Sequence, residues 1–233
     1  MAELNYYKKD MEKIQKKLLK RIDSVLQGLV VLNDEQLATA FREIDFVDEL
    51  NKLGFANLLE KIRKSYNKQA VKSFNVLDAA QKTKQTVTAV QAIEVLSILD
   101  LTTISAGVTR YANEIKTAMF RGLLTGQSSQ SIMEGLTQTY GVGKALSSNQ
   151  QVALLNDSFA RFNRTTTAKL FEDIPEQKFR YVGTLDSKTR DECRNTLALS
   201  QKEFTMEEIN DLTTGVSFAD GGGFNCRHEW IPV

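Results

Sequence analysis

The sequence predicts an α+β protein, in which a long, mainly α-helical N-terminal part precedes a small C-terminal α+β domain with a short antiparallel sheet. Both prolines of the 233-residue chain lie in its last quarter, at Pro175 and Pro232. Proline usage of roughly 5% would place about nine in the first 174 residues, and because proline breaks helix interiors, their absence favours long helices there. After Pro175 the hydrophobic pattern changes to the alternation of strands. We therefore predict domains at 1–174 and 175–233, with a division of the first into 1–110 and 111–174 left open.

The composition is that of a globular protein. Hydrophobic residues make up 42% and charged residues 25% of the chain, and 30 basic residues face 29 acidic ones, which argues against disorder and against histone-like DNA binding. No run of 18 consecutive apolar residues occurs, so we expect no membrane span. Met1 to Tyr7 is followed by Lys8 and Lys9 rather than by an apolar stretch, so we expect no export signal. Two cysteines fit a reducing cytosol.

The first helices are predicted from periodicity and charge. Met11, Leu18, Val25 and Leu32 recur every seven residues, which indicates an amphipathic helix over 4–32. Acidic residues outnumber basic ones in 33–50, and basic residues outnumber acidic ones in 61–84. The basic faces either are solvated, contact an acidic partner or DNA phosphates, or pair with the acidic block. The candidate DNA or partner contacts are Lys13, Lys16, Lys20, Lys61, Arg63, Lys64, Lys68 and Lys72.

Later helices are predicted from apolar content and stop signals. Residues 86–108 carry only two charges, so we predict a buried helix, with a partner-binding helix as the alternative. A helix over 114–124 should end at Gly126, and Ser128 or Ser129 should begin the next, which stops near Gly141. A long helix over 150–173 follows. Its candidate core positions are Val152, Leu155, Phe159, Phe162 and Leu170.

After Pro175 we predict two strands separated by two short helices. Residues 178–184 read as the first strand, and Asp186 as the N-cap of a helix containing Arg190, Cys193 and Leu197. Thr205 and Glu208 form a capping box, with Phe204 and Ile209 placed for a hydrophobic staple. Residues 224–231 read as a closing strand. Its alternation would put Phe224, Cys226, His228 and Trp230 on one face.

The chemically active residues leave several alternatives open. The sequence has no P-loop and no dinucleotide fingerprint, and no motif supports a catalytic pair of Cys193 and His228. Cys193, Cys226 and His228 are candidate ligands of a structural zinc ion, with Asp186 as a fourth. Alternatively these three residues are buried in the core beside Trp230, or the two cysteines form a disulfide. We expect no cofactor, while structural zinc stays possible.

Two C-terminal segments stand out by their residue order. The first is Tyr181-Val182-Gly183-Thr184-Leu185-Asp186, with Thr189, Arg190 and Cys193 after it; the second is Gly221-Gly222-Gly223-Phe224-Asn225-Cys226-Arg227-His228, with Trp230 and Pro232. Together they resemble the Mu F-like minor head proteins of tailed bacteriophages, also called phage head morphogenesis proteins. Upstream, residues 121–128 and the helix over 150–171 look like the helical lead-in of such proteins, so the resemblance covers about residues 115–233. The motif residues are Asp186, Arg190, Cys193, Asn225, Cys226, Arg227, His228 and Trp230.

One departure from the family bears on metal binding. Many members have a histidine shortly before the Asn-Cys-Arg segment, where this chain has glycines and Phe224. If members bind metal through that histidine, this chain has one ligand fewer.

The resemblance implies a virion component without enzymatic activity, inside the capsid near the portal vertex and in the host cytoplasm during assembly. It would act in head assembly, genome packaging or DNA delivery. Its expected partners are the portal protein, other head proteins and packaged double-stranded DNA, and no membrane. Basic residues exceed acidic ones up to residue 175 and fall short of them afterwards, so DNA contact is expected from the helical part. The alternatives are a metal-assisted hydrolase or nuclease using Asp186, Glu192 and His228, and a non-viral helical scaffold.

Overall fold

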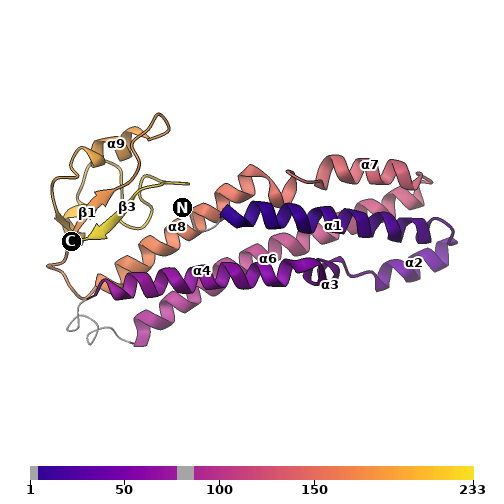
Figure 1. Cartoon of the computed structure of the whole chain (residues 1–233), viewed down its shortest axis with the longest axis horizontal. Helices are drawn as coiled ribbons and strands as arrows, with labels where there is room; N and C mark the ends of the chain where they lie inside the picture. Colours follow the sequence, from indigo (N-terminus) through magenta and orange to yellow (C-terminus); the bar gives the residue numbers. More distant parts are fainter. Residues whose placement is uncertain (1–4, 78–86) are drawn as a thin grey trace. The chain divides into compact units, whose positions relative to one another are not determined.

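The structure is a computed structural model that describes residues 5–77 and 87–233. These residues form two compact units. The helical unit combines the described residues up to 63 with residues 101–152, and the sheet unit combines 64–100 with 153–233. The described residues are 69% helical and contain one small antiparallel sheet, which confirms the predicted α+β class (Figure 1). Each compact unit joins two separate stretches of the chain, so the units do not test a boundary drawn at one point of the sequence. The boundary at residue 175 therefore stays a prediction.

The helical unit is built around the apolar stripe of α1 (Asn5–Leu29). Met11, Leu18, Ile22 and Leu26 are fully buried, whereas Val25 is only half-buried. An α-helix has 3.6 residues per turn, so the buried stripe drifts away from a strict seven-residue spacing. The other elements that contribute to this unit are α2 (Asp34–Glu43), α3 (Phe46–Leu50), a π-helical turn (Asn51–Phe55), α4 (Ala56–Asn75), α6 (Val87–Leu124), α7 (Ser129–Tyr140), a 3₁₀ turn (Ala145–Ser147) and α8 (Asn149–Phe171).

Local capping signals set the ends of several helices. The Ser128 hydroxyl accepts the backbone N–H of Ser131 and begins α7, as predicted. Gly126, at the end of α6, has a φ of 72°, a left-handed conformation that glycine adopts without steric cost. The predicted helix over 114–124 is therefore the last part of the longer helix α6.

The sheet unit packs α8 against three short strands. These are β1 (Lys178–Val182), β2 (Phe204–Thr205) and β3 (Glu229–Pro232), in the order β2-β1-β3 and all antiparallel. Phe179 and Tyr181 of β1 are buried, and in the register they lie opposite Phe204 and Trp230. Two short helices, α9 (Asp191–Leu197) and α10 (Met206–Asn210), connect the strands.

Two predictions for this unit are wrong. The closing strand begins at Glu229, not at Phe224, and the Phe224 side chain is 52% exposed. Gly221, Gly223 and Asn225 have positive φ angles, so the chain turns there instead of extending. Asp186 is not a helix N-cap either: α9 starts at Asp191, and the Asp186 carboxylate instead accepts the N–H of Lys188 in the preceding turn.

The first half of α6 is much more exposed than predicted. Val90, Val95, Ile98 and Leu99 are each more than half exposed, so the prediction of a buried helix is wrong. Apolar content alone does not reveal whether neighbours are present on all sides of a helix.

The segment Val90–Leu124 is long and apolar enough to cross a membrane, judged by length and composition alone. A stretch of 18 residues within it has a mean hydropathy of 1.4, and 11% of that stretch is buried. Core helices of soluble proteins also pass this test. The segment contains Asp100, whose carboxylate accepts a 2.8 Å hydrogen bond from the Tyr66 hydroxyl within the sheet unit. Burial raises the pKa of Asp100. The expectation of no membrane contact stays a prediction.

Candidate functional site

Three side chains that the sequence singled out meet in the sheet unit. Cys193 comes from α9, and Cys226 and His228 come from the loop before β3; all three are at least 96% buried. The two Sγ atoms lie 3.6 Å apart, and Cys226 Sγ lies 3.7 Å from His228 Nδ1. All three potential ligand atoms fall within 4.8 Å of one another. We call this group the Cys–His cluster.

Hydrogen bonds fix the orientation of each member of the Cys–His cluster. His228 Nε2 lies 2.8 Å from the carbonyl oxygen of Thr184. A carbonyl only accepts, so Nε2 carries the proton and the lone pair of Nδ1 points towards Cys226. The Tyr181 hydroxyl donates to Cys193 Sγ at 3.5 Å, and the backbone N–H of Gly222 donates to Cys226 Sγ at 3.2 Å.

The two thiols have different acidities. Burial raises the pKa of Cys193. Burial also acts to raise the pKa of Cys226, but hydrogen bonds at its sulfur, first that from the Gly222 backbone N–H, outweigh it and lower this pKa to about 7. Burial raises the pKa of Tyr181 far above its ordinary value, so its hydroxyl stays a hydrogen-bond donor. Cys226 is therefore the thiol that ionises more readily.

Glycines allow the backbone to approach the Cys–His cluster closely. A Cβ atom on Gly222 would lie 2.2 Å from Cys193 Sγ, and a Cβ atom on Gly183 would lie 2.1 Å from His228 Cδ2. No heavy-atom contact of that length is tolerated. These two glycines leave the space that the sulfur and the imidazole ring occupy.

Charged motif residues hold the loop that carries Cys226 and His228. Both Asp186 oxygens accept bonds of 2.6 Å from Arg227, a bidentate pair. Arg190 donates to the carbonyl oxygens of Gly222 at 2.6 Å and Phe224 at 2.5 Å. The remaining two motif residues also take part: the Asn225 N–H donates to the Asp157 carboxylate, and the Trp230 ring packs 4.8 Å from that of Tyr181.

Helix α8 contributes contacts that sequence reasoning missed. Arg164 is 3% exposed, and its guanidinium donates to the carbonyl oxygens of Ala219 at 2.7 Å, His228 at 3.4 Å and Cys226 at 3.5 Å. One signal in the sequence could have indicated these buried charges. Asp157 and Arg164 lie seven positions apart, among the apolar core positions of the helix.

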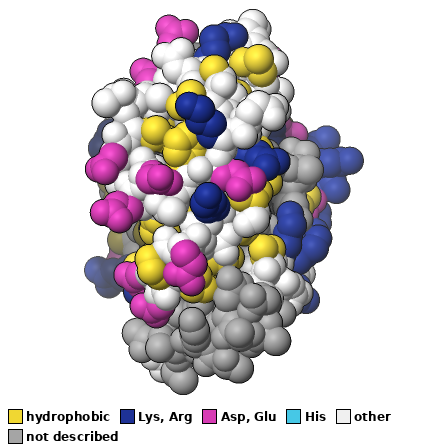
Figure 2. Space-filling view, turned by 90° about the vertical axis from the view of Figure 1, so that its left-hand side faces the viewer, with side chains coloured by type: hydrophobic (Ala, Val, Ile, Leu, Met, Phe, Trp, Pro, Cys, Tyr) yellow, Lys and Arg dark blue, Asp and Glu magenta, His cyan; other side chains and the backbone are white. Residues whose placement is uncertain are grey.

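The predicted DNA or partner contacts are exposed on α1 and α4. Part of their charge is compensated locally, because Lys61 and Lys13 lie 2.7 Å and 3.7 Å from Asp10, and Arg63 lies 2.9 Å from Glu60. Exposed ion pairs of this kind are weak and screened by salt. Figure 2 shows that one face of the molecule carries both signs of charge among hydrophobic side chains.

The three residues named for a hydrolase or nuclease, Asp186, Glu192 and His228, do not share a site in the described part of the chain. Asp186 is paired with Arg227, and His228 faces Cys226. Within residues 5–77 and 87–233, the group of acidic, cysteine and histidine side chains able to share a metal ion contains His228 but neither Asp186 nor Glu192.

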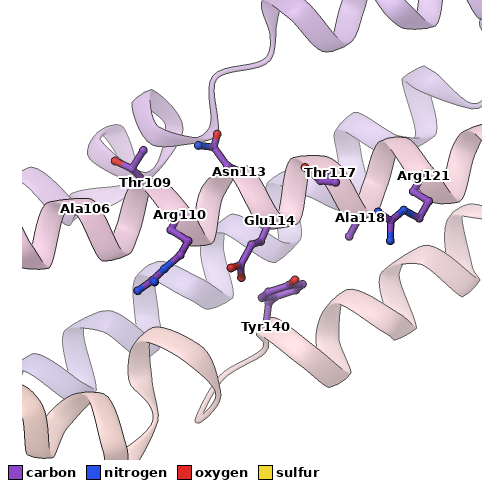
Figure 3. A pocket seen from close by; sticks show the side chains of 9 residues that line it. All are labelled: Ala106, Thr109, Arg110, Asn113, Glu114, Thr117, Ala118, Arg121 and Tyr140. Atoms are coloured by element: carbon purple, nitrogen blue, oxygen red, sulfur yellow. The ribbon is translucent and has the colours of Figure 1, made fainter.

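Two of the hollows in the described part of the chain lie beside residues of interest. A groove of about 750 Å³ runs along α6 in the helical unit, where Arg110, Glu114 and Arg121 face it together with Tyr140 (Figure 3). A smaller cavity of about 300 Å³ adjoins the Cys–His cluster. Its wall consists of Lys188, Thr189, Arg190, Cys193, Asn225, Cys226, Arg227 and His228.

The fold and the site define a mainly helical α+β protein with a buried Cys–His cluster. Comparisons with known protein families, with characterised proteins and with solved structures find no match for this chain.

The Asp186–Arg227 pair predicts an acid-sensitive contribution to stability. The Arg227 guanidinium holds the pKa of Asp186 well below its usual range, so this contribution is present above the ordinary pKa of about 3.9 and is lost as pH falls through the lowered pKa. Asp186→Asn should therefore be less stable than the unchanged chain at pH 7, and the difference should shrink towards pH 2. Urea unfolding across this range measures it. Asp191→Asn, which removes an exposed carboxylate of α9, is the control, and a pH-independent difference for Asp186→Asn would contradict the assignment.

Proposed function

We propose that this chain is a minor head protein of a tailed bacteriophage that docks near the portal vertex and acts in head assembly, genome packaging or DNA delivery. The proposal is supported by the order of the motif residues in the sequence and by one structural observation. The two segments that resemble the Mu F-like proteins lie more than 20 residues apart in the sequence, yet Asp186 binds Arg227 and Arg190 binds the glycine loop. Such mutual contacts are expected of a motif that defines a domain.

A binding role suits these residues better than catalysis. The charged motif side chains are engaged with one another or with backbone carbonyls, and the Cys–His cluster is buried. General acid or base catalysis needs a group within hydrogen-bonding reach of a substrate. The metal-assisted hydrolase or nuclease is supported less, because Asp186 and His228 belong to separate networks.

The first half of α6 provides the surface for docking on a portal or head protein. Ile93 packs against the sheet-unit core, whereas Val90, Val95 and Leu99 are more than half exposed. Exposed apolar side chains that lie close together are typical of protein interaction sites. The lysines of α1 and α4 supply the contact with packaged DNA, which would weaken steeply with salt.

Co-expression of the full chain with the portal protein of the same phage tests the docking. We expect the two proteins to co-elute in size-exclusion chromatography at micromolar concentration. Val95→Glu should abolish co-elution, because it places a charge in the exposed apolar surface and removes no buried side chain. Val31→Glu changes a valine that is 80% exposed and is the matched control, which should still co-elute.

Independent elution of the unchanged chain and the portal protein would contradict direct docking. Equal co-elution of Val95→Glu and Val31→Glu would instead contradict the assignment of the surface to α6. A non-viral helical scaffold, the third alternative, would be absent from purified phage particles.

A further inference from the structure

We propose that Cys193, Cys226 and His228 bind one zinc ion, with the fourth coordination position facing the adjoining cavity. The proposal does not depend on the phage function, because it follows from the geometry of the Cys–His cluster. The chain has two cysteines and one histidine in total, and all three converge on this point.

Two of the three distances within the cluster match those between ligands around a single ion. Zinc binds thiolate sulfur at about 2.3 Å and imidazole nitrogen at about 2.0–2.1 Å in a tetrahedron, which separates two sulfurs by about 3.8 Å and a sulfur from a nitrogen by about 3.6 Å. The corresponding separations are 3.6 Å between the sulfurs and 3.7 Å between Cys226 Sγ and His228 Nδ1. The third pair of donor atoms, Cys193 Sγ and the His228 ring nitrogen, lies within 4.8 Å.

The histidine is oriented as a metal ligand. A ligating imidazole usually donates its other N–H to a carboxylate or a backbone carbonyl, which fixes the tautomer and leaves the ligating nitrogen unprotonated. His228 does this through Nε2 and the Thr184 carbonyl oxygen at 2.8 Å. Nδ1 is thereby directed into the cluster.

The sulfur atoms are surrounded by groups that favour thiolates. The Gly222 N–H and the Tyr181 hydroxyl each donate to one sulfur. Two buried thiolates would repel each other strongly, but a divalent cation between them makes the site neutral. The same two donors then act as the outer shell of the metal site.

The proposed site has three protein ligands, so it differs from a closed structural zinc site in its fourth coordination position. Closed sites have four protein ligands, whereas sites with three leave one position for water. All three ligands line the cavity of about 300 Å³, which also presents Thr189 and Asn225. A water molecule in this cavity would complete the coordination.

A disulfide between Cys193 and Cys226 is the competing state of the same residues. Their sulfurs are 3.6 Å apart and unbonded, compared with about 2.05 Å in a disulfide. Oxidation would remove two electrons and two protons from the thiols and would destroy the proposed site. The experiment must therefore distinguish a metal-bound dithiolate from a disulfide.

The test uses the full chain without a histidine tag, purified under reducing conditions from cells supplied with zinc. We expect one zinc ion per chain by elemental analysis. Titration of the zinc-free protein with cobalt(II) should give the charge-transfer bands of cobalt–thiolate bonding and the visible bands of tetrahedral coordination, saturating at one equivalent. His228→Asn, Cys193→Ser and Cys226→Ser should each weaken zinc binding by more than tenfold.

Val216→Ala is the matched control for loss of stability. Val216 is buried in the same core but contributes no ligand, so this variant should keep one zinc ion per chain. The cobalt spectrum of the unchanged chain remains decisive even if a ligand variant does not fold. A folded chain that gives no cobalt–thiolate bands, or a Cys193–Cys226 disulfide recovered by mass spectrometry after anaerobic purification, would overturn the proposal.

Discussion

Phe179→Ala is expected to lower the free energy of unfolding of the sheet unit by about 3–5 kcal/mol, the usual cost of truncating a buried phenylalanine. Phe179 is completely buried in the central strand. Its ring lies 4.8 Å from that of Phe218 and 5.5 Å from that of Phe171, both in edge-to-face geometry. The substitution would therefore leave a cavity between β1 and α8 and remove two favourable ring contacts.

Urea unfolding followed by tryptophan fluorescence measures this effect in the sheet unit itself. Trp230 is the single tryptophan of the chain and is 2% exposed there. Phe224→Ala is the matched control, because Phe224 is 52% exposed and its truncation should change stability by less than about 0.5 kcal/mol. Similar losses for the two variants would contradict the described core and would favour the predicted strand over 224–231.

Arg164→Ala is expected to destabilise the same unit by about 3 kcal/mol, since a hydrogen bond to a charged donor contributes about 1.5–3 kcal/mol. Arg164 connects α8 to the loop before β3 through the carbonyl oxygens of Ala219, Cys226 and His228. Without the guanidinium these acceptors lose a partner in a buried environment. The loop that carries two of the three cluster residues would then be held mainly by Arg190 and by the Asp186–Arg227 pair.

Arg161→Ala provides the comparison on the same helix. Arg161 lies 3.1 Å from Asp220, but both side chains are more than half exposed, so its loss should cost less than about 1 kcal/mol. The two variants remove the same side chain and differ in burial and acceptors. An Arg164→Ala effect no larger than that of Arg161→Ala would show that Arg164 does not hold the loop.

Local structure could be predicted where a signal lies within a few residues. Thr205 accepts the N–H of Glu208, whose carboxylate accepts the N–H of Thr205, so the predicted capping box is confirmed. Ser128 and Gly126 mark helix ends as expected. These predictions succeed because each depends on backbone groups that are neighbours in sequence.

Predictions that depend on distant partners were less successful. The exposure of α6 depends on which segments pack beside it, and apolar content does not encode this. The closing strand was placed too early because Asn225 adopts a φ of 56°, which alternation cannot reveal. Arg164 was missed because its acceptors lie at least 55 residues away in the sequence.

The candidate site could be predicted in its residue types but not in its geometry. Cys193, Cys226 and His228 were singled out by their rarity and chemistry, and the fold brings them together. The expected strand geometry did not supply the arrangement; the turn after Gly223 did. Asp186 was proposed as a cap or a fourth ligand, but a bidentate pair with Arg227 occupies both of its oxygens.

A reconstruction of particles of the phage that encodes this chain tests the proposed function most directly. We predict density for the chain inside the head at the portal vertex, with the exposed side of α6 against the portal or a neighbouring head protein. Absence of the chain from purified particles, or its location away from the portal vertex, would contradict the proposal.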